Sequence, residues 1–319
     1  MRRRDVIAVL GGAAAVWVRF ASAQKSGVPV LAILNSSRET SEYFWKVFSR
    51  DMQALGWEDN RNIRVIRRWP EKADEGMSEL ARNLIAEGAT VIFAGAGDSA
   101  IRAAQKATSS LPIVGMSDDM VASGLVASLA RPGSNTTGVS ILASELNAKR
   151  LELLHELVPQ ARRIAILADP TTVSTRHQLE SAARELNVEL FFHAATNRDE
   201  IEAELANIAA NRMGAVNILA SPFLNAARDL LIERLAEIAI PAIYQWPEAS
   251  EEGGLMGYGP RITLCYRHVA ILIDKILRGA KPADLPVEQP NVLTLRLICG
   301  RPKGLASSFP PASYCVPRR

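Results

Sequence analysis

The sequence predicts an α/β protein built from two doubly wound, Rossmann-like lobes. Short apolar runs alternate with amphipathic stretches from residue 28 onward, and the same alternation starts again after residue 141. A glycine-rich stretch at residues 253–260 then leads into one more helical pattern. Apolar strands that alternate with helices are typical of parallel sheets covered on both faces. We therefore expect two such sheets, with the chain crossing between them.

In the first lobe, strands are predicted where short apolar runs end in glycine or small polar residues, and helices where apolar positions recur every three or four residues. The run at 90–94, for example, is apolar after Thr90 and meets Gly95, which predicts a buried strand followed by a loop. The expected strands are 28–34, 63–67, 90–94, 111–115 and 137–141, and the expected helices are 40–55, 77–87 and 99–108.

The second lobe begins with a helix over 145–158, whose apolar stripe contains Leu151, Leu154 and Leu157. Asn197 followed by Glu200 forms a capping-box-like start for a later helix. The remaining expected elements are strands at 163–167, 188–193, 215–219 and 242–244 and helices at 175–186 and 225–238. The glycine-rich stretch at 253–260 is interpreted as a crossing between lobes, before a helix at 262–277. A single domain with a large insertion is the alternative.

The first 23 residues resemble an export signal. Arg2, Arg3 and Arg4 precede an apolar stretch at 6–18, and residues 21–23 read Ala-Ser-Ala, an A-x-A cleavage pattern. The apolar stretch is shorter than the roughly 20 residues of a spanning helix. We predict cleavage near Ala23 and a working protein outside the cytoplasm, exported by either the general or the twin-arginine route. An uncut N-terminal anchor is the alternative.

Composition excludes several partner classes. The formal charge of +3 comes from the signal, which holds four arginines and one aspartate, so the rest of the chain is close to neutral. Neither nucleic acid nor an anionic membrane is therefore expected as a partner. No later apolar run approaches membrane-spanning length, so stable insertion of the mature chain is not expected. The cysteines Cys265, Cys299 and Cys315 lack metal-ligand spacing, and we expect no metal and no cofactor.

Small polar or aromatic clusters follow most of the predicted strands. Ligands of open α/β sheets bind beyond the carboxyl ends of the strands, where helix N-termini offer free N–H groups. Hydroxyls and N–H groups suit a carboxylate, acidic side chains an ammonium and aromatic rings an apolar body. The candidate ligand-binding residues are Asn35, Ser36, Ser37, Gly97, Asp98, Ser99, Ser117, Asp118, Asp169, Thr171, Ser221, Tyr244, Trp246 and Tyr258. The alternative is that each cluster only caps a helix.

A dinucleotide site and a catalytic site are less favoured by the sequence. Residues 95–100 fit the G-x-G-x-x-A pattern of dinucleotide sites, with Asp118 about twenty residues later, but the pattern follows the third strand rather than the first. The four histidines lack metal-ligand spacing, and no G-x-S-x-G motif is present. No catalytic residue is therefore expected. An exported enzyme that uses Asp118 or Asp169 as acid or base is the less favoured alternative.

Several longer strings resemble a large bacterial group of substrate-binding proteins of ABC transporters. They are the signal end Ala-Ser-Ala-Gln, MVASGLVASLARPGSNTTGVS at 120–140, AKRLELL at 148–154, PAIY at 241–244, GGLM at 253–256, YGP at 258–260 and GAKPADLPV at 279–287. The resemblance implies a type I periplasmic binding fold, with two lobes joined by three crossings that close around one small ligand. The implied lobes are 24–140 plus 259–290 and 141–258 plus 291–298.

The same resemblance implies a periplasmic, non-enzymatic protein that delivers a solute to an inner-membrane ABC permease. Characterised relatives take up amino acids, some of them aromatic, so a small carboxylate-bearing solute such as an amino acid is expected. A sugar is the second candidate, because aromatic side chains also stack on sugars. A sensor that presents its ligand to a receptor kinase is the alternative role.

The last residues depart from the family pattern. Residues 299–319 contain no acidic residue and no helical period. Members of the family usually end with an apolar strand and, after it, a segment that contains acidic residues. Codons for residues 303–311 can be chosen so that a neighbouring frame reads Lys-Gly-Leu-Gly-Ile-Glu-Leu-Pro-Pro, a family-like string. We interpret 299–319 as an atypical tail that follows a frameshift near residue 298. A divergent natural terminus is the alternative.

Overall fold

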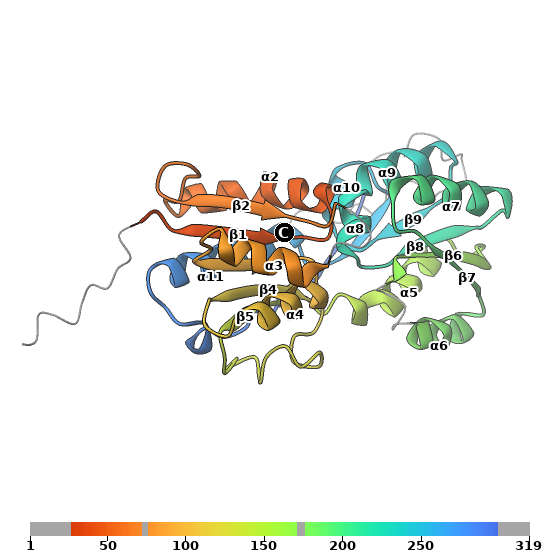
Figure 1. Cartoon of the computed structure of the whole chain (residues 1–319). Helices are drawn as coiled ribbons and strands as arrows, with labels where there is room; N and C mark the ends of the chain where they lie inside the picture. Colours follow the sequence, from red (N-terminus) through yellow and green to blue (C-terminus); the bar gives the residue numbers. More distant parts are fainter. Residues whose placement is uncertain (1–26, 72–75, 171–175, 299–319) are drawn as a thin grey trace, which may run out of the picture.

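The computed structural model describes residues 27–71, 76–170 and 176–298. The predicted signal at 1–23 and the atypical tail at 299–319 lie outside the described residues. Two α/β lobes lie side by side along the long axis of the molecule, each with a sheet between layers of helices (Figure 1).

The first lobe is built on a fully parallel five-stranded sheet with the order β2-β1-β3-β4-β5. Its strands are β1 (Val30–Leu34), β2 (Arg64–Arg68), β3 (Val91–Ala94), β4 (Ile113–Ser117) and β5 (Thr136–Ser140). Four of the five follow one another outward from β1 with short crossovers, as a doubly wound sheet requires.

Helices cover both faces of this sheet because successive strand residues point in opposite directions. Leu31 and Ile33 of β1 pack into one buried cluster, and Ala32 and Leu34 pack into another. The first cluster lies under α2 (Arg38–Ala54) and α11 (Ile262–Leu277), and the second lies under α3 (Met77–Ala86) and α4 (Asp98–Ala107). The sheet is thus the middle layer of three.

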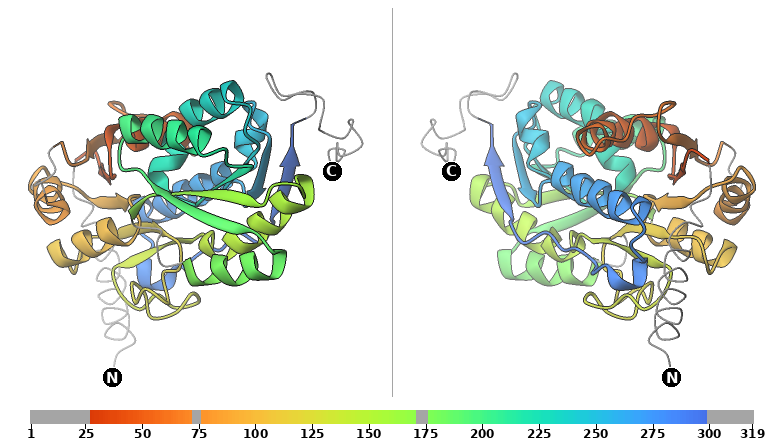
Figure 2. Two further views of the ribbon diagram at one scale, coloured as in Figure 1. Left: turned by 90° about the vertical axis from the view of Figure 1, so that its right-hand side faces the viewer. Right: turned by 90° about the vertical axis from the view of Figure 1, so that its left-hand side faces the viewer.

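The second lobe holds a six-stranded sheet with the order β11-β10-β9-β8-β6-β7. Its strands are β6 (Arg163–Ala168), β7 (Glu189–Ala194), β8 (Ala215–Ile218), β9 (Ala242–Tyr244), β10 (Met256–Gly259) and β11 (Thr294–Leu297). All pairings are parallel except that of β10 with β11, the edge strand visible in Figure 2.

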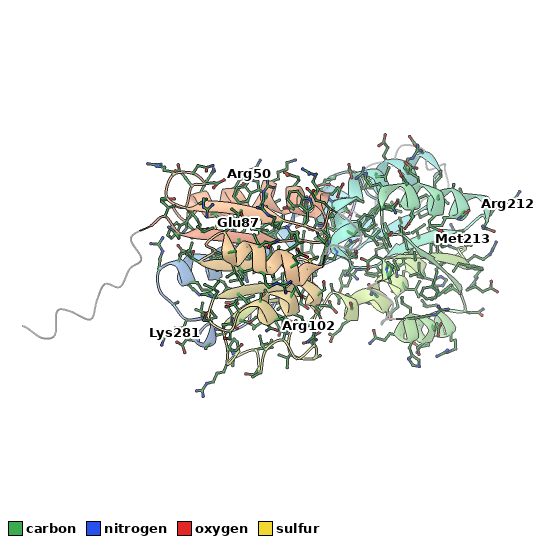
Figure 3. All side chains as sticks on the ribbon, viewed as in Figure 1. Arg50, Glu87, Arg102, Arg212, Met213 and Lys281 are labelled. Carbon is green, nitrogen blue, oxygen red and sulfur yellow. The ribbon has the colours of Figure 1, made fainter. Side chains whose placement is uncertain are left out.

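Two layers of helices also enclose this second sheet. One buried cluster joins it to α5 (Asn147–Leu157) and α6 (Arg176–Leu186). The other joins it to α7 (Arg198–Ala210), α8 (Pro222–Ala226) and α9 (Arg228–Glu237). Asn197 caps α7, where its side chain accepts from the Glu200 N–H at 2.9 Å, as the sequence predicted. Figure 3 shows side chains filling both lobes, with exposed residues such as Arg50 and Arg212 at the periphery.

The chain passes between the two sheets three times. The first passage runs from β5 through a short 3₁₀ turn, η1 (Ser144–Leu146), into α5. The second runs from β10 into α11 of the first lobe, and the third leads from η3 (Pro282–Asp284), beside β5, to β11. The predicted fold class is confirmed. The residue limits given for the lobes stay a prediction.

Two expectations about single elements were wrong. The glycine-rich stretch is not itself a crossing, because residues 256–259 form β10 in the second sheet and the crossing follows them. Glycine is needed there for close packing, since a Cβ on Gly257 would lie 2.2 Å from the Trp246 carbonyl oxygen. The single helix expected at 225–238 is two helices, α8 and α9, which meet at Ala227.

None of the helices within the described ranges is both long and apolar enough to cross a membrane.

Candidate ligand-binding site

A cavity of about 440 Å³ lies between the two lobes. The first lobe contributes residues that follow the carboxyl ends of β1, β3, β4 and β5, and residues at the starts of α2 and α11. The second lobe contributes residues that follow β8 and β9. Neighbouring parallel strands end at the same edge of a sheet, so chain segments far apart in the sequence converge here.

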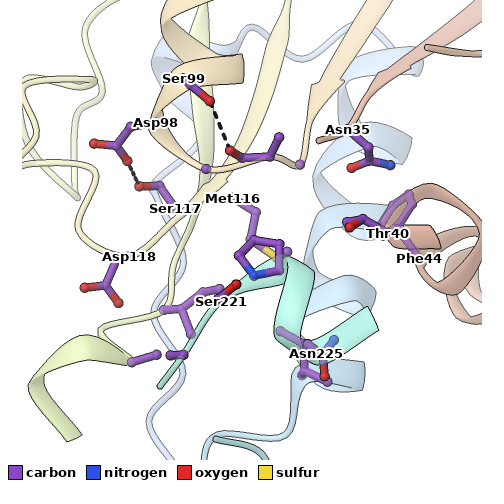
Figure 4. A pocket seen from close by; sticks show the side chains of 18 of the residues that line it. Asn35, Thr40, Phe44, Asp98, Ser99, Met116, Ser117, Asp118, Ser221 and Asn225 are labelled. Atoms are coloured by element: carbon purple, nitrogen blue, oxygen red, sulfur yellow. Dashed lines mark hydrogen bonds between the residues drawn. The ribbon is translucent and has the colours of Figure 1, made fainter. Parts of the chain in front are cut away.

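Aspartates and hydroxyls gather at one side of the cavity (Figure 4). The Ser117 hydroxyl donates to the Asp98 carboxylate, and Asp118 Oδ1 accepts from the Ser144 N–H at 2.9 Å. Asp119 also lines the cavity, although its Oδ1 accepts from the N–H groups of the following turn. In the described part of the chain, no lysine, arginine or histidine lines the cavity. The charged side chains that line the site in these residues are therefore all aspartates, which favours a positively charged group on the ligand.

Aromatic rings form another wall of the cavity. Phe44 stacks on Phe93 with ring centroids 4.4 Å apart, and Tyr266 meets Phe44 edge-on at 5.0 Å and 88°. Trp246 enters from the second lobe and packs into the same buried cluster. Such rings offer a large apolar surface with geometric selectivity for another ring.

Arg150 lies fully buried beneath the site and joins several segments. Its Nε donates to the Tyr258 carbonyl at 2.7 Å, Nη1 to the Ala143 carbonyl at 3.0 Å and Nη2 to the Gln245 carbonyl at 3.2 Å. Burial lowers the pKa of the guanidinium to about 9, and nearby Asp118 opposes that effect. Arg150 thus ties the first crossing to the ends of β9 and β10.

Most of the residues predicted from the sequence converge on this cavity. The predicted residues that line it are Asn35, Gly97, Asp98, Ser99, Ser117, Asp118, Ser221 and Trp246. The six residues of the first lobe converge because β1, β3 and β4 are neighbours in one sheet, and Ser221 and Trp246 follow the neighbouring strands β8 and β9 of the other sheet. Whether these side chains contact a ligand stays a prediction.

Ser36 and Ser37 do not line the cavity. Ser37 is the N-cap of α2 and accepts from the Thr40 N–H at 3.2 Å, while the Ser36 hydroxyl donates to the Thr40 hydroxyl at 3.4 Å. Both hydroxyls hydrogen-bond within the first turn of their own helix, and Ser37 caps it. A role of either residue in ligand binding stays a prediction.

Three more predicted residues lie outside the cavity lining. Tyr244 is buried in a core cluster of the second lobe, and this burial raises its pKa. Tyr258 packs against the opposite core cluster of that lobe. Asp169 is buried behind the cavity wall and accepts from the Ser221 hydroxyl. Both tyrosines lie within strands, β9 and β10, and their side chains point toward the core clusters on the faces of the sheet, not toward the cavity. Thr171 lies outside the described residues.

Sequence reasoning missed the lining residues that helices supply. The main ones are Thr40, Phe44, Ile262, Tyr266 and Asn225, and two lining residues inside strands, Phe93 of β3 and Met116 of β4, were missed as well. Thr40 with Phe44 on α2, and Ile262 with Tyr266 on α11, are pairs four residues apart, which places each pair on one helix face. That spacing was visible, but only the packing of α2 beside α11 shows that both faces meet the cavity.

Among the described residues, no group of histidine, cysteine, aspartate and glutamate side chains is placed to hold a metal ion.

A polar and aromatic cleft between two doubly wound lobes with three crossings defines the class of two-lobed solute-binding proteins with the type I periplasmic binding fold. The chain belongs to the ABC transporter substrate binding protein family, whose sequence pattern matches residues 37–298.

Known relatives agree with this assignment. A tyrosine-binding protein of Clostridioides difficile is 25% identical over 249 residues, which are 76% of this chain and 70% of that protein. Among solved structures, an ABC domain of Streptococcus pneumonia in complex with L-Trp has a TM-score of 0.67, 19% identity, and coverage of 84% of this chain and 91% of that one. A conserved domain protein of Vibrio cholerae has a TM-score of 0.71, 20% identity, and coverage of 85% and 92%.

Proposed function

We propose that this chain is the exported solute-binding component of an ABC importer and that it binds an aromatic amino acid in the cavity between its lobes. The observation that carries the proposal is the composition of the cavity, which combines aspartates with a wall of aromatic rings and holds no basic side chain in the described residues. Its volume of about 440 Å³ is in the range of small-molecule sites.

The aspartates support an ammonium group on the ligand. Asp98 is hydrogen-bonded by Ser117, and one oxygen of Asp118 is hydrogen-bonded by Ser144, so both carboxylates are held in place at the cavity wall. A ligand carboxylate would find N–H groups at the start of α4, a ten-residue helix whose N-cap Gly97 makes no side-chain capping bond. Helix N-termini favour anions.

Family membership supports the remaining parts of the proposal. Substrate-binding proteins of this family work with an ABC permease, and the N-terminal residues have the pattern of an export signal. We place the mature protein in the periplasm, where it would deliver its ligand to an inner-membrane permease. The relatives that bind tyrosine or tryptophan favour an aromatic amino acid over a sugar.

Titration calorimetry of the purified chain tests this function. We expect L-tyrosine or L-tryptophan to bind with one site per chain, and 3-(4-hydroxyphenyl)propionate, which lacks the amine, to bind far more weakly. The ligand should be recovered unaltered after long incubation. Binding only to sugars, or chemical conversion of the amino acid, would overturn the proposal.

A further inference from the structure

Asn35 occupies a distinctive position at the aromatic wall of the cavity. It follows β1 directly, is 1% exposed and lines the cavity. Its backbone N–H donates to the Arg68 carbonyl at 3.0 Å, which fixes the residue at the end of the strand. Figure 4 places Asn35 with Thr40 and Phe44 on the side of the pocket opposite Asp98 and Asp118.

The amide of Asn35 has unused hydrogen-bonding capacity. Its Nδ2 is buried and has no hydrogen-bond partner among the described residues. The neighbouring Thr40 hydroxyl is already engaged by Ser36 and Ser37, at 3.4 and 3.2 Å. The amide of Asn225, across the cavity in the second lobe, interacts with the Tyr43 hydroxyl, and Asn225 is not among the buried side chains that lack a partner. A buried amide that lacks a partner is costly, so a ligand group that supplies one gains affinity.

The space around the amide is shaped by Gly95. A Cβ on Gly95 would lie 2.6 Å from Asn35 Oδ1 and 2.5 Å from Phe93 Cε1, so the amide and the Phe93 ring sit side by side at this point. Phe93 in turn stacks on Phe44. A ligand ring that packs on this wall would therefore carry its outer edge past the Asn35 amide.

The strand order sets the distance between the two sides of the cavity. Asn35 follows β1 and Asp118 follows β4, and β3 lies between them in the sheet. Two strand intervals span roughly 10 Å. This span suits an aromatic amino acid that has its amine at the aspartates and its ring substituent at Asn35.

We propose that Asn35 is the specificity-determining residue that reads a hydroxyl on the ligand ring, so that the site selects tyrosine over phenylalanine. The inference rests on the proposed function and extends it to one side chain. The phenol both donates and accepts, so it can pair with either end of the Asn35 amide. Phenylalanine would cover the amide with an apolar ring edge and leave it unpaired, and sites built to bond a hydroxyl reject such analogues.

Calorimetry with L-tyrosine and L-phenylalanine tests the inference on the unaltered chain first. We expect tyrosine to bind about 10-fold to 100-fold more tightly, as expected when a buried group gains a partner. In Asn35→Ala this ratio should fall to about one, mainly through loss of tyrosine affinity. Equal affinities for the two amino acids in the unaltered chain would overturn the inference and leave the proposed function intact. This comparison does not depend on the folding of any variant.

Asn225→Ala is the matched control, because it removes an asparagine amide from the same cavity that already has a partner. We expect it to weaken both amino acids by a similar factor and to keep their ratio. A ratio that persists in Asn35→Ala, or one that collapses equally in both variants, would refute the role of Asn35. If no aromatic amino acid binds the unaltered chain, the proposed function itself fails.

Discussion

Aspartates are the only charged side chains that line the cavity among the described residues, so the ammonium and the carboxylate of the proposed ligand would meet different surroundings. Asp118 Oδ1 accepts from the Ser144 N–H, and its other carboxylate oxygen accepts no hydrogen bond from the part of the chain that the structure describes. This arrangement leaves acceptor capacity for a ligand ammonium. Hydrogen bonds to charged groups are among the stronger ones in proteins.

Asp118→Asn should weaken the binding of L-tyrosine by about 10-fold or more, because a bond to a charged group contributes about 1.5–3 kcal/mol. The asparagine can still accept from the Ser144 N–H, so the local backbone should be preserved. The amine-free analogue 3-(4-hydroxyphenyl)propionate is the control ligand, and its affinity should stay the same or rise. Equal losses for both ligands would show that Asp118 acts on the structure rather than on the amine.

Arg150 is a single side chain that contributes to the stability of the fold. Replacing it by alanine removes the donor to the Gln245 and Tyr258 carbonyls, while the Ala143 carbonyl still accepts from the Leu146 N–H. Each buried group left unsatisfied costs about 1–3 kcal/mol. We expect Arg150→Ala to lower the free energy of unfolding in urea by about 3 kcal/mol or more. Arg162→Ala, at an exposed arginine, is the control and should change it by about 0.5 kcal/mol or less. A similar small effect at Arg150 would contradict its role as a tie between segments.

Among the elements, the sequence predicted those with a clear apolar pattern and missed a strand that contains glycine. Residues 242–244 and 262–277 were predicted with the bounds the structure has, because no glycine or proline interrupts their apolar patterns. β10 was missed because Gly257 and Gly259 weaken a strand pattern, and the close approach of Trp246 that requires glycine is a tertiary contact. The cavity-facing sides of α2 and α11 were also missed, because only the tertiary packing of the two helices brings them to the cavity.

The start of α2 offers a direct test of whether Ser36 and Ser37 serve the helix or a ligand. Ser37→Ala should lower the free energy of unfolding by about 1 kcal/mol through loss of the N-cap, whereas Ser36→Ala should change it by about 0.5 kcal/mol or less. Thermal or urea unfolding measures both. Neither variant should change the affinity for L-tyrosine by as much as Asp118→Asn does. A large affinity loss in Ser37→Ala with stability intact would restore it as a ligand-binding residue.

At the scale of the whole molecule, the lobes also touch outside the cavity. The Arg228 guanidinium, at the start of α9, lies 4.2 Å from the centroid of the Tyr43 ring on α2. Arg228 is held by Glu252 and by the Asn225 carbonyl, which keeps it facing the first lobe. Neither Arg228 nor Tyr43 lines the cavity, so this contact can favour the arrangement of the lobes without touching a ligand.

Arg228→Met should therefore weaken ligand binding by about 2-fold to 30-fold, the equivalent of a cation–π contact of about 0.5–2 kcal/mol. Arg67→Met is the matched control, because Arg67 lies 5.6 Å from the Trp45 ring within the first lobe alone. Calorimetry gives the affinities, and small-angle scattering should show a larger radius of gyration for Arg228→Met with ligand present. Unchanged affinity in Arg228→Met, or an equal loss in both variants, would argue against an inter-lobe role.

A crystal structure of the chain with L-tyrosine will show whether the cavity between the two lobes is an amino-acid site. We predict one ligand in that cavity, with its amine at Asp118, its ring on Phe44 and Phe93, and its hydroxyl at Asn35. Tyrosine bound elsewhere on the molecule, or in the cavity with its amine directed away from the aspartates, would contradict the account.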